Sequence, residues 1–242
     1  MLNALKQTVL GKRLEKAKSV IYQRYFQPNY PNIAAKRNII PLNHVYWIYN
    51  DANLKQHQPI IIDCGTGYTA DFSIALMSKY NAICYGVDPT KKHTPALNNI
   101  TKKYPKNFIR LMYALSDING TAIFYETAEN ESSSMLQDHI NVKNDTITPY
   151  PVKTITLQTL FTELKLSTVD ILKIDIEGME CKVLDNTPNN ILLQANQIIV
   201  EFHHHTTDSI TETDVQHTIN KLTRLGYKKF TSDNINYLFY QI

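Results

Sequence analysis

The sequence has little glycine and little cysteine, and it has no long apolar run. Its 242 residues include seven glycines, three cysteines and one tryptophan. No apolar run approaches the roughly 18 residues that a membrane-spanning helix needs, and the basic N-terminus has no apolar segment typical of a secretory signal. The three cysteines are odd in number and far apart in the chain. They predict reduced thiols in a cytoplasmic protein, and they argue against a zinc site.

The net charge of +3 conceals an uneven distribution. Residues 1–24 contain six basic side chains against one acidic side chain, so the rest of the chain is slightly acidic. The body of the protein therefore shows no nucleic-acid-binding surface by charge. The basic end is either a solvated helix face or a surface for weak peripheral contact with an anionic membrane, and both interpretations stay open.

Turn residues and apolar periodicity divide the chain into two parts. Residues 1–53 predict an N-terminal helical extension, with a helix over 3–26, a proline-containing connector over 27–42 and a short helix over 43–53. Residues 54–242 predict a single α/β domain.

Apolar runs of strand length alternate with helical segments in residues 54–242. The runs are Pro59–Asp63, Ala82–Val87, Phe108–Met112, Thr121–Tyr125, Val169–Ile176, Gln197–Phe202, Tyr227–Thr231 and Tyr237–Gln241. The helical segments are 70–80, 91–103, 156–165, 178–186 and 210–225. This alternation predicts a mostly parallel sheet covered on both faces, and the short link before the last run predicts a final antiparallel strand. The polar stretch 126–150 predicts a long loop.

Two of the seven glycines lie in one short turn, Asp63-Cys64-Gly65-Thr66-Gly67, directly after an apolar run. Glycine lets the backbone approach a ligand closely, and the start of the following helix offers free N–H groups. Position 70 is Ala, so the third glycine of a dinucleotide-binding fingerprint is missing. The turn resembles the acidic-x-Gly-x-Gly turn of S-adenosylmethionine (SAM) methyltransferases, in which the acidic residue and the turn backbone hold the methionine part of the cofactor. A turn without a ligand is the alternative.

Asp88 and Pro89 end the next apolar run along the chain. An acidic side chain at the carboxyl end of the second strand can accept hydrogen bonds from both ribose hydroxyls of a nucleoside. An Asp-Pro pair is also typical of the start of a helix, with Asp as the N-cap. The sequence leaves both roles open for Asp88.

Three charged residues, Lys173, Asp175 and Glu177, share one side of the predicted strand Val169–Ile176. A lone charge inside a covered sheet is destabilising, so three charges indicate mutual pairing or a cleft at the carboxyl end of the strand. Ligands bind in such clefts in open α/β sheets. A structural Lys–Asp ion pair is the alternative for Lys173.

The run KIDIEGMECKVL (173–184) closely resembles the signature of the FkbM family of methyltransferases. Further family landmarks follow in the expected order over roughly residues 58–240: DCGTGYT (63–69), VDP (87–89), ALSDINGTAIFY (114–125), SSSM (132–135), VKTITLQTL (152–160) and LGY (225–227). The chain departs from the more common family pattern in the turn, at Gly67 and Thr69, and at Asp88, where Glu is more frequent.

The resemblance implies a Rossmann-like class I methyltransferase fold with a seven-stranded sheet, and SAM as the cofactor. It implies methyl transfer to a hydroxyl of a sugar, glycan or polyketide-like small molecule. The implied cofactor residues are Asp63, Gly65, Thr66, Gly67, Asp88, Pro89, Leu115 and Ser116. The candidate catalytic residues are Lys173, Asp175, Glu177 and His203.

His203 shares a strand face with Glu201, next to the predicted strand Gln197–Phe202. If this strand neighbours Val169–Ile176, His203 lies beside Asp175 and is suited to act as general base toward a hydroxyl. With Glu177 these side chains could instead form an oxygen-rich site for a divalent metal. No ligand spacing here is diagnostic, so no metal ligands are assigned.

Two other functions stay open, a nucleotide-binding dehydrogenase and a non-catalytic Rossmann-like binding domain. The missing third glycine argues against the dehydrogenase. The intact acidic residues Asp63, Asp88, Asp175 and Glu177 argue against a domain that has lost catalysis.

Overall fold

The computed structural model describes residues 39–41 and 47–242. The predicted helix over 3–26, almost all of the predicted connector, and the basic segment 1–24 lie outside the described residues. The elements from strand β2 onward belong to one compact unit, Ile40–Ile242. No helix in the described part of the chain is long and apolar enough to span a membrane.

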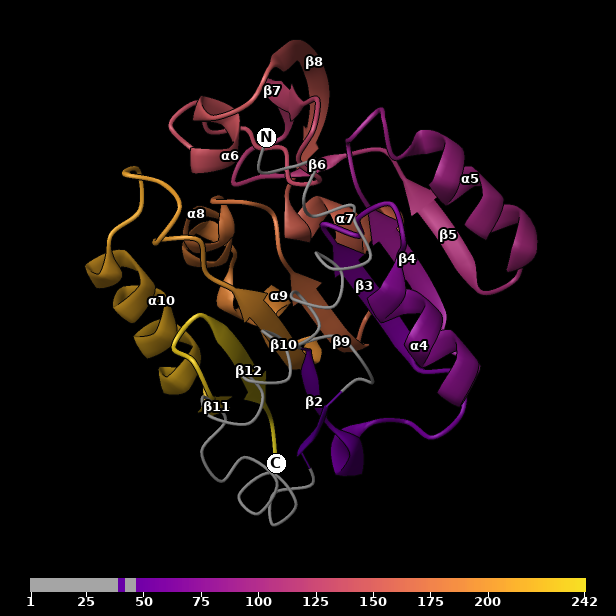
Figure 1. Ribbon diagram of the computed structural model, residues 1–242. Helices are drawn as coiled ribbons and strands as arrows, with labels where there is room; N and C mark the ends of the chain where they lie inside the picture. The colour runs from indigo at the N-terminus through magenta and orange to yellow at the C-terminus, as the bar shows by residue number, and fades with distance from the viewer. Residues whose placement is uncertain (1–38, 42–46) are drawn as a thin grey trace, which may run out of the picture. The chain divides into compact units, whose positions relative to one another are not determined.

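The described residues form a seven-stranded sheet with the strand order β11-β12-β10-β9-β3-β4-β5 (Figure 1). Its strands are β3 (Ile60–Cys64), β4 (Ile83–Val87), β5 (Phe108–Leu111), β9 (Val169–Ile174), β10 (Ala195–Glu201), β11 (Lys228–Thr231) and β12 (Asn236–Tyr240). β3, β4, β5, β9 and β10 pair in parallel. β12 lies between β10 and β11 and runs antiparallel to both. The prediction of a mostly parallel sheet with a C-terminal antiparallel strand is confirmed.

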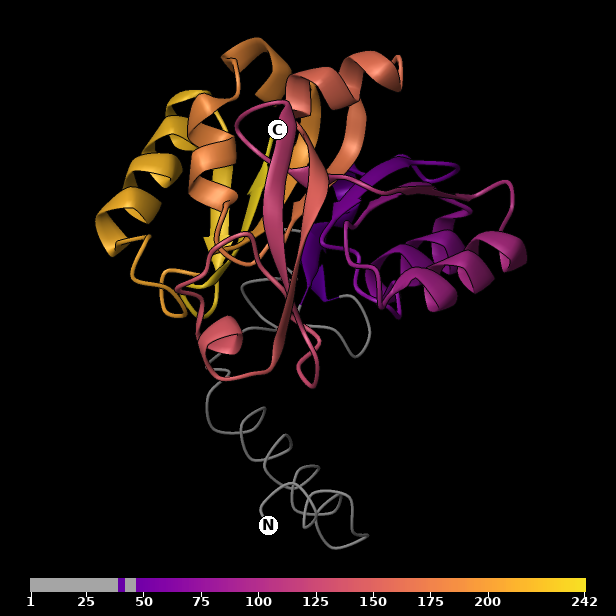
Figure 2. The same ribbon diagram turned by 90° about the horizontal axis from the view of Figure 1, so that it is seen from above.

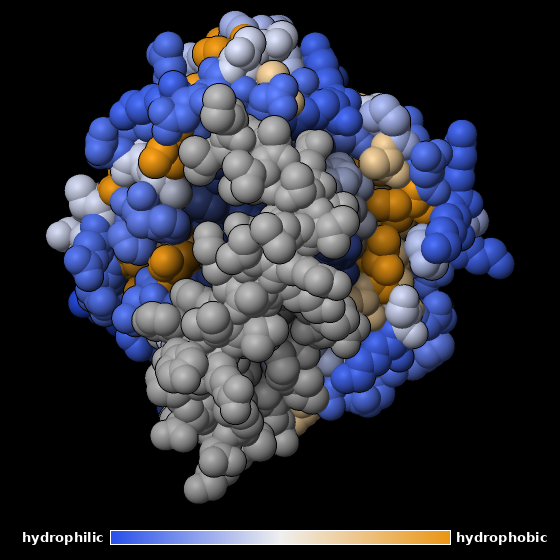
Figure 3. All heavy atoms as spheres, viewed as in Figure 1, coloured by the Kyte–Doolittle hydropathy of each residue, from blue (hydrophilic) through white to orange (hydrophobic). Residues whose placement is uncertain are grey.

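Helices cover both faces of this sheet, and this explains the continuous apolar runs of its central strands. Figure 2 shows α4 (Asp71–Tyr80) and α5 (Thr94–Lys103) on one face, and α7 (Leu157–Glu163), α8 (Glu180–Asn186) and α9 (Asn189–Leu192) on the other. α10 (Glu212–Arg224) contacts α8. Figure 3 shows mostly hydrophilic side chains on the visible face of the described part, with small apolar areas between them.

The described residues also form a second, three-stranded sheet with the order β6-β8-β7, whose strands β7 and β8 flank and partly overlap the predicted long loop 126–150. β6 is Ala114–Leu115, β7 is Gly120–Thr127, α6 is Ile140–Lys143 and β8 is Ile147–Ile155. The predicted strand Thr121–Tyr125 therefore belongs to this sheet and not to the central one, and the loop prediction over 126–150 is wrong at both ends. Pro149 and Pro151 argue against a strand at β8 in the sequence. Both prolines are tolerated because β6 pairs only with Thr154 and Ile155, so one edge of β8 is unpaired at the prolines.

The predicted short helix over 43–53 is also wrong for the residues of it that are described. Ile48–Asn50 is strand β2, which pairs with β1 (Ile39–Pro41), and Asp51–Asn53 is one turn of 3-10 helix. The Asn50 N–H donates to Gln197 Oε1 at 2.6 Å, and Gln197 Nε2 donates to the Asn50 carbonyl at 2.9 Å. These long-range hydrogen bonds to β10 hold the segment extended, against its local periodicity.

Candidate active site

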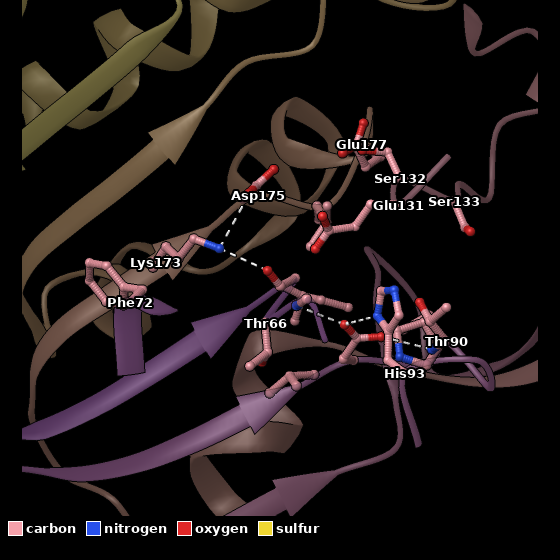
Figure 4. A pocket seen from close by; sticks show the side chains of 18 of the residues that line it. Thr66, Phe72, Thr90, His93, Glu131, Ser132, Ser133, Lys173, Asp175 and Glu177 are labelled. Carbon is pink, nitrogen blue, oxygen red and sulfur yellow. Dashed lines mark hydrogen bonds and ion pairs between the residues drawn. The ribbon is translucent and has the colours of Figure 1, made fainter. Parts of the chain in front are cut away.

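A cavity opens at the carboxyl ends of β3, β4 and β9. This is the point where the strand order reverses, since β4 and β5 lie on one side of β3 and β9 and β10 on the other. Open α/β sheets bind ligands at such a switch point. The segments that follow the three strands line the cavity, together with Trp47, Phe72, and residues 131–133 and 135 of the β7–β8 connection (Figure 4).

The two glycines of the turn after β3 join it to the ends of two neighbouring strands. Gly65 and Gly67 have φ angles of +75° and +68°, in the left-handed region. A Cβ atom on Gly65 would lie 1.5 Å from the carbonyl oxygen of Asp175, so the turn packs directly on the end of β9. The Gly67 N–H donates to Asp88 Oδ2 at 3.0 Å, which joins the turn to the end of β4. Gly65, Thr66 and Gly67 all line the cavity.

Asp88 is a buried carboxylate at the cavity wall. It accepts hydrogen bonds from the Gly67 N–H and, at 2.8 Å, from the Thr90 N–H, and it lies 3.1 Å from His93 Nδ1. Burial raises the pKa of Asp88, but hydrogen bonds and the charge of His93 outweigh burial and lower the pKa below its usual value. The helix N-cap alternative for Asp88 is wrong, because α5 begins at Thr94 with His93 in the cap position.

Lys173 is buried, and its ammonium joins two strands. It lies 3.3 Å from Asp63 Oδ1 and 3.2 Å from Asp175 Oδ2, and it donates to the Gly65 carbonyl at 2.8 Å. Figure 4 shows the side chain between Asp175 and the turn after β3. Burial lowers the pKa of Lys173, and the two carboxylates more than reverse that effect, so the pKa lies above its usual value. Lys173 is thus both ion-paired and at the cavity wall, and the two sequence interpretations hold together.

Two of the predicted cofactor residues lie behind the cavity wall. Asp63 is fully buried: it pairs with Lys173, and its Oδ2 accepts a hydrogen bond from Ser73 Oγ at 2.7 Å. Ser116 is buried and its hydroxyl donates to Asp117 Oδ1. Neither belongs to the described residues that line the cavity, whereas Pro89 and Leu115 do. The prediction of direct cofactor contact by Asp63 and Ser116 is not supported by this placement.

A cluster of carboxylates and histidines follows β9 and β10. β9 and β10 are neighbours, as expected, and His203 Nε2 lies 3.7 Å from Asp175 Oδ1 and 3.3 Å from Glu177 Oε2. His203 Nδ1 lies 2.8 Å from Glu180 Oε1. Asp175 and Glu177 line the cavity, and His203 lies immediately behind them. Asp175, Glu177 and His203 could together ligate a metal ion, since their ligand atoms lie within 4.8 Å of one another.

The two carboxylates at the cavity have opposite pKa shifts. Burial raises the pKa of Asp175. Burial also acts on Glu177, but hydrogen bonding by His139 and the charge of His203 reverse it and lower the pKa of Glu177 to about 2. Behind them, burial and Asp175 raise the pKa of Glu201 to about 7. Burial lowers the pKa of His203, and the carboxylates of Glu180, Glu177 and Asp175 raise it well above its usual value.

Sequence reasoning missed several residues of the site. Glu180 stands inside the signature run, but its contact with His203 depends on the fold. His139 lies in the predicted loop, 3.1 Å from Glu177 Oε2. Trp47, the only tryptophan of the chain, lies in the segment predicted as helix, and its ring is 4.7 Å from Lys173 Nζ. A single tryptophan is a feature that the sequence shows, but the residues around it gave no reason to place it at this cavity.

Comparison with known proteins gives a family match and distant structural similarities. The family model of the methyltransferase FkbM domain matches residues 63–229. A precorrin-6y C5,15-methyltransferase from Geobacter metallireducens is 12% identical over 79% of this chain and 84% of its own, with a TM-score of 0.42. Aeropyrum pernix fibrillarin, solved with bound SAM, is 10% identical over 86% and 72% of the two chains, with a TM-score of 0.42. No curated protein matches the chain in sequence.

The strand order, the single inserted antiparallel strand and the switch-point cavity define a class I SAM-dependent methyltransferase. The chain belongs to the FkbM methyltransferase family, because the matched domain covers most of its length, from Asp63 to Lys229. Its cofactor is SAM. The cavity fits this cofactor, since it has a turn in which Gly65 leaves no room for a side chain and a buried, ionised Asp88 on its wall.

Proposed function

We propose that the protein transfers a methyl group from SAM to a hydroxyl group of a sugar, glycan or polyketide-like small molecule. The observation that carries this proposal is the pair of carboxylates at the end of β9, where Asp175 has a raised pKa and Glu177 a lowered one. Environments that push two pKa values apart are typical of acid–base pairs with different roles.

The turn backbone of Gly65–Gly67 and the Asp88 carboxylate would hold the cofactor, with Pro89 and Leu115 as apolar contacts. Asp88 would accept a hydrogen bond from the ribose. Asp63 would support cofactor binding indirectly. It pairs with Lys173, and Lys173 in turn donates a hydrogen bond to the Gly65 carbonyl of the turn. SAM supplies an electrophilic methyl group in this site.

Asp175 is the group we assign to the acceptor proton. Its pKa is raised by burial, so its carboxylate is a stronger base than an exposed aspartate, while Lys173 keeps it ionised and oriented. Glu177 stays ionised at neutral pH and can hold the acceptor by a hydrogen bond. His203, fixed by Glu180, balances the negative charge of both carboxylates. Orientation and removal of water provide the remaining rate enhancement.

The rest of the cavity lining favours an acceptor that is polar on one side and apolar on the other. Ser132, which hydrogen-bonds Glu177, extends the polar side, whereas Phe124, Met135 and Trp47 offer apolar or aromatic surface. A sugar or polyketide-like molecule has both kinds of surface.

The proposal is tested in two stages. Calorimetry with SAM and with NAD should show binding of SAM alone. Mass spectrometry of host glycans, lipids and small metabolites should then show a methyl-sized mass increase with the protein, and none with a Glu177→Gln variant that still binds SAM. A methylated nitrogen or carbon in the product would overturn the hydroxyl assignment, and NAD binding would overturn the methyltransferase mechanism.

Weak peripheral contact with an anionic membrane by residues 1–24 is a separate proposal that rests on charge alone. Each Lys or Arg near an anionic bilayer contributes about 1 kcal/mol, so a cationic face of Lys12, Arg13, Lys16 and Lys18 suffices for reversible docking. Sedimentation with anionic liposomes should show salt-sensitive binding that is lost when these four residues are changed to Gln. Equal sedimentation of both proteins would remove this proposal.

A further inference from the structure

We infer that His93 is a second hydrogen-bond partner for the ribose of SAM and shares the 2′,3′-diol with Asp88. The inference rests on the proposed placement of the ribose at Asp88. It adds a cofactor residue for which the sequence gave no signal.

His93 is a buried ring at the cavity wall with one nitrogen in use. His93 is only 5% exposed, and it lines the cavity. Nδ1 lies 3.1 Å from Asp88 Oδ2, whereas the buried Nε2 has no hydrogen-bond partner among the described residues. Figure 4 shows the ring next to Thr90. Most buried polar groups in folded proteins are paired, so an unpaired one at a cavity wall indicates a ligand contact.

The contact with Asp88 determines the hydrogen-bonding role of Nδ1 and leaves Nε2 for a ligand. The pKa of Asp88 is lowered, so its carboxylate is ionised and can only accept hydrogen bonds. Nδ1 must therefore carry the hydrogen. Nε2, directed away from Asp88, accepts from a hydroxyl when the ring is neutral and donates to the hydroxyl oxygen when the ring is charged.

Asp88 has hydrogen-bonding capacity for only one of the two ribose hydroxyls, so the other hydroxyl needs a second partner. Its two oxygens already receive the Gly67 N–H, the Thr90 N–H and the His93 ring. A carboxylate has about four lone-pair sites, so one is left. A ribose diol brings two hydroxyl donors. One hydroxyl can bind Asp88, and the adjacent Nε2 of His93 is placed to form a hydrogen bond with the other.

The ring is held in this position from two sides. It occupies the cap position of α5, directly before Thr94 and Pro95, and its centroid lies 5.9 Å from that of Tyr68. A fixed ring loses little conformational freedom on binding, and this favours recognition over chance proximity.

The test is a double-mutant cycle on binding, with S-adenosylhomocysteine and its 2′-deoxy and 3′-deoxy analogues measured by calorimetry. His93→Phe keeps the ring and removes both nitrogens. We expect it to bind S-adenosylhomocysteine about five- to tenfold more weakly, the effect of one hydrogen bond. One deoxy analogue should bind the wild type more weakly by a similar factor, and the same analogue should show no further loss in His93→Phe. His93→Gln, which can donate to Asp88 and still offer an oxygen, should recover part of the affinity.

The matched control is His217→Phe. His217 also pairs through Nδ1 with a carboxylate, Asp185 at 3.1 Å, but it lies on α10 with its side chain 69% exposed. This variant should bind all three ligands as the wild type does. If both deoxy analogues lose the same affinity in His93→Phe as in the wild type, His93 does not touch the diol and the inference is overturned.

The two proposals fail in different ways. If Asp88→Ala couples to a deoxy position and His93→Phe and His93→Gln do not, the ribose lies at Asp88 and only the role of His93 is wrong. If neither residue couples to the diol, the ribose lies elsewhere and both assignments are wrong.

Discussion

The two ends of the cavity hold their charges in different ways. At one end, Asp88 is held mainly by main-chain N–H groups and one imidazole ring. At the opposite end, Lys173, Asp175, Glu177 and His203 hold one another through ion pairs. The first arrangement is set by backbone geometry and presents a fixed acceptor. The second is a network in which each charge depends on its neighbours.

This difference predicts a division of labour. Changes at the Asp88 end should alter cofactor affinity, whereas changes at the Asp175 end should alter turnover, stability and their dependence on pH. The predictions that follow test this division, beginning with the largest expected effect.

Asp175→Asn should reduce turnover by roughly 10²–10⁴-fold, the usual contribution of a positioned general base. The affinity for SAM should change by no more than a few-fold, because Asp88 is untouched. Turnover with the identified acceptor and calorimetry with SAM measure the two quantities. The control is Asp208→Asn, whose side chain is 92% exposed. Comparable losses of turnover and SAM affinity in Asp175→Asn would contradict the proposed division of labour between the two ends of the cavity.

Lys173→Met should lower the free energy of unfolding by about 3–5 kcal/mol, because it leaves the buried Asp63 without its cation. Urea unfolding measures this loss. Lys143→Met removes a lysine whose ion pair with Asp208 is exposed, so its loss should stay below about 1 kcal/mol. Similar stabilities of the two variants would show that the Lys173 network is not a structural element.

Asp88→Ala should weaken SAM binding by roughly 10- to 100-fold, since hydrogen bonds to charged groups contribute about 1.5–3 kcal/mol. Turnover at saturating SAM should fall much less than in Asp175→Asn. Calorimetry and initial rates at high SAM concentration give the two values. An unchanged SAM affinity in folded Asp88→Ala protein would remove the ribose from this residue.

Glu201→Gln should make stability less dependent on pH. The pKa of Glu201 is raised from 4.5 to about 7, so the folded protein binds more protons than the unfolded chain between these values. Its contribution to stability is fully present below pH 4.5 and is lost as the pH rises through about 7. From pH 5 to pH 8 the wild type should therefore lose about 1–3 kcal/mol more than the variant. Equal losses in urea unfolding at the two pH values would contradict the shift.

Chelator treatment should have the smallest effect. The carboxylates of Asp175 and Glu177 already have cationic or hydrogen-bonding neighbours in Lys173, His203 and His139. Turnover should therefore survive extensive dialysis against EDTA. Complete loss of turnover that magnesium or manganese restores would instead make Asp175, Glu177 and His203 a metal site.

The inner strands β3, β9 and β10 of the central sheet could be predicted because they are buried on both faces, so local composition alone marks them. The elements that were missed depend on contacts between distant residues. β8 contains two prolines and forms only because β7 pairs along its length. Strand β2 stays extended because Asn50 bonds to Gln197, which is 147 residues away.

The sequence by itself determined the family, the glycine turn and the candidate acidic residues Asp88, Asp175 and Glu177. Each of these is recognised from a short run of neighbouring residues, so no long-range contact is needed to predict it. The tertiary structure decided which of those residues face the cavity. It placed Asp63 behind Lys173, and it brought Trp47, His93 and His139 to the site from segments with no local signal. The tertiary structure also set the opposite pKa shifts of Asp175 and Glu177, since the desolvation and the charges that cause such shifts come from neighbours on other elements.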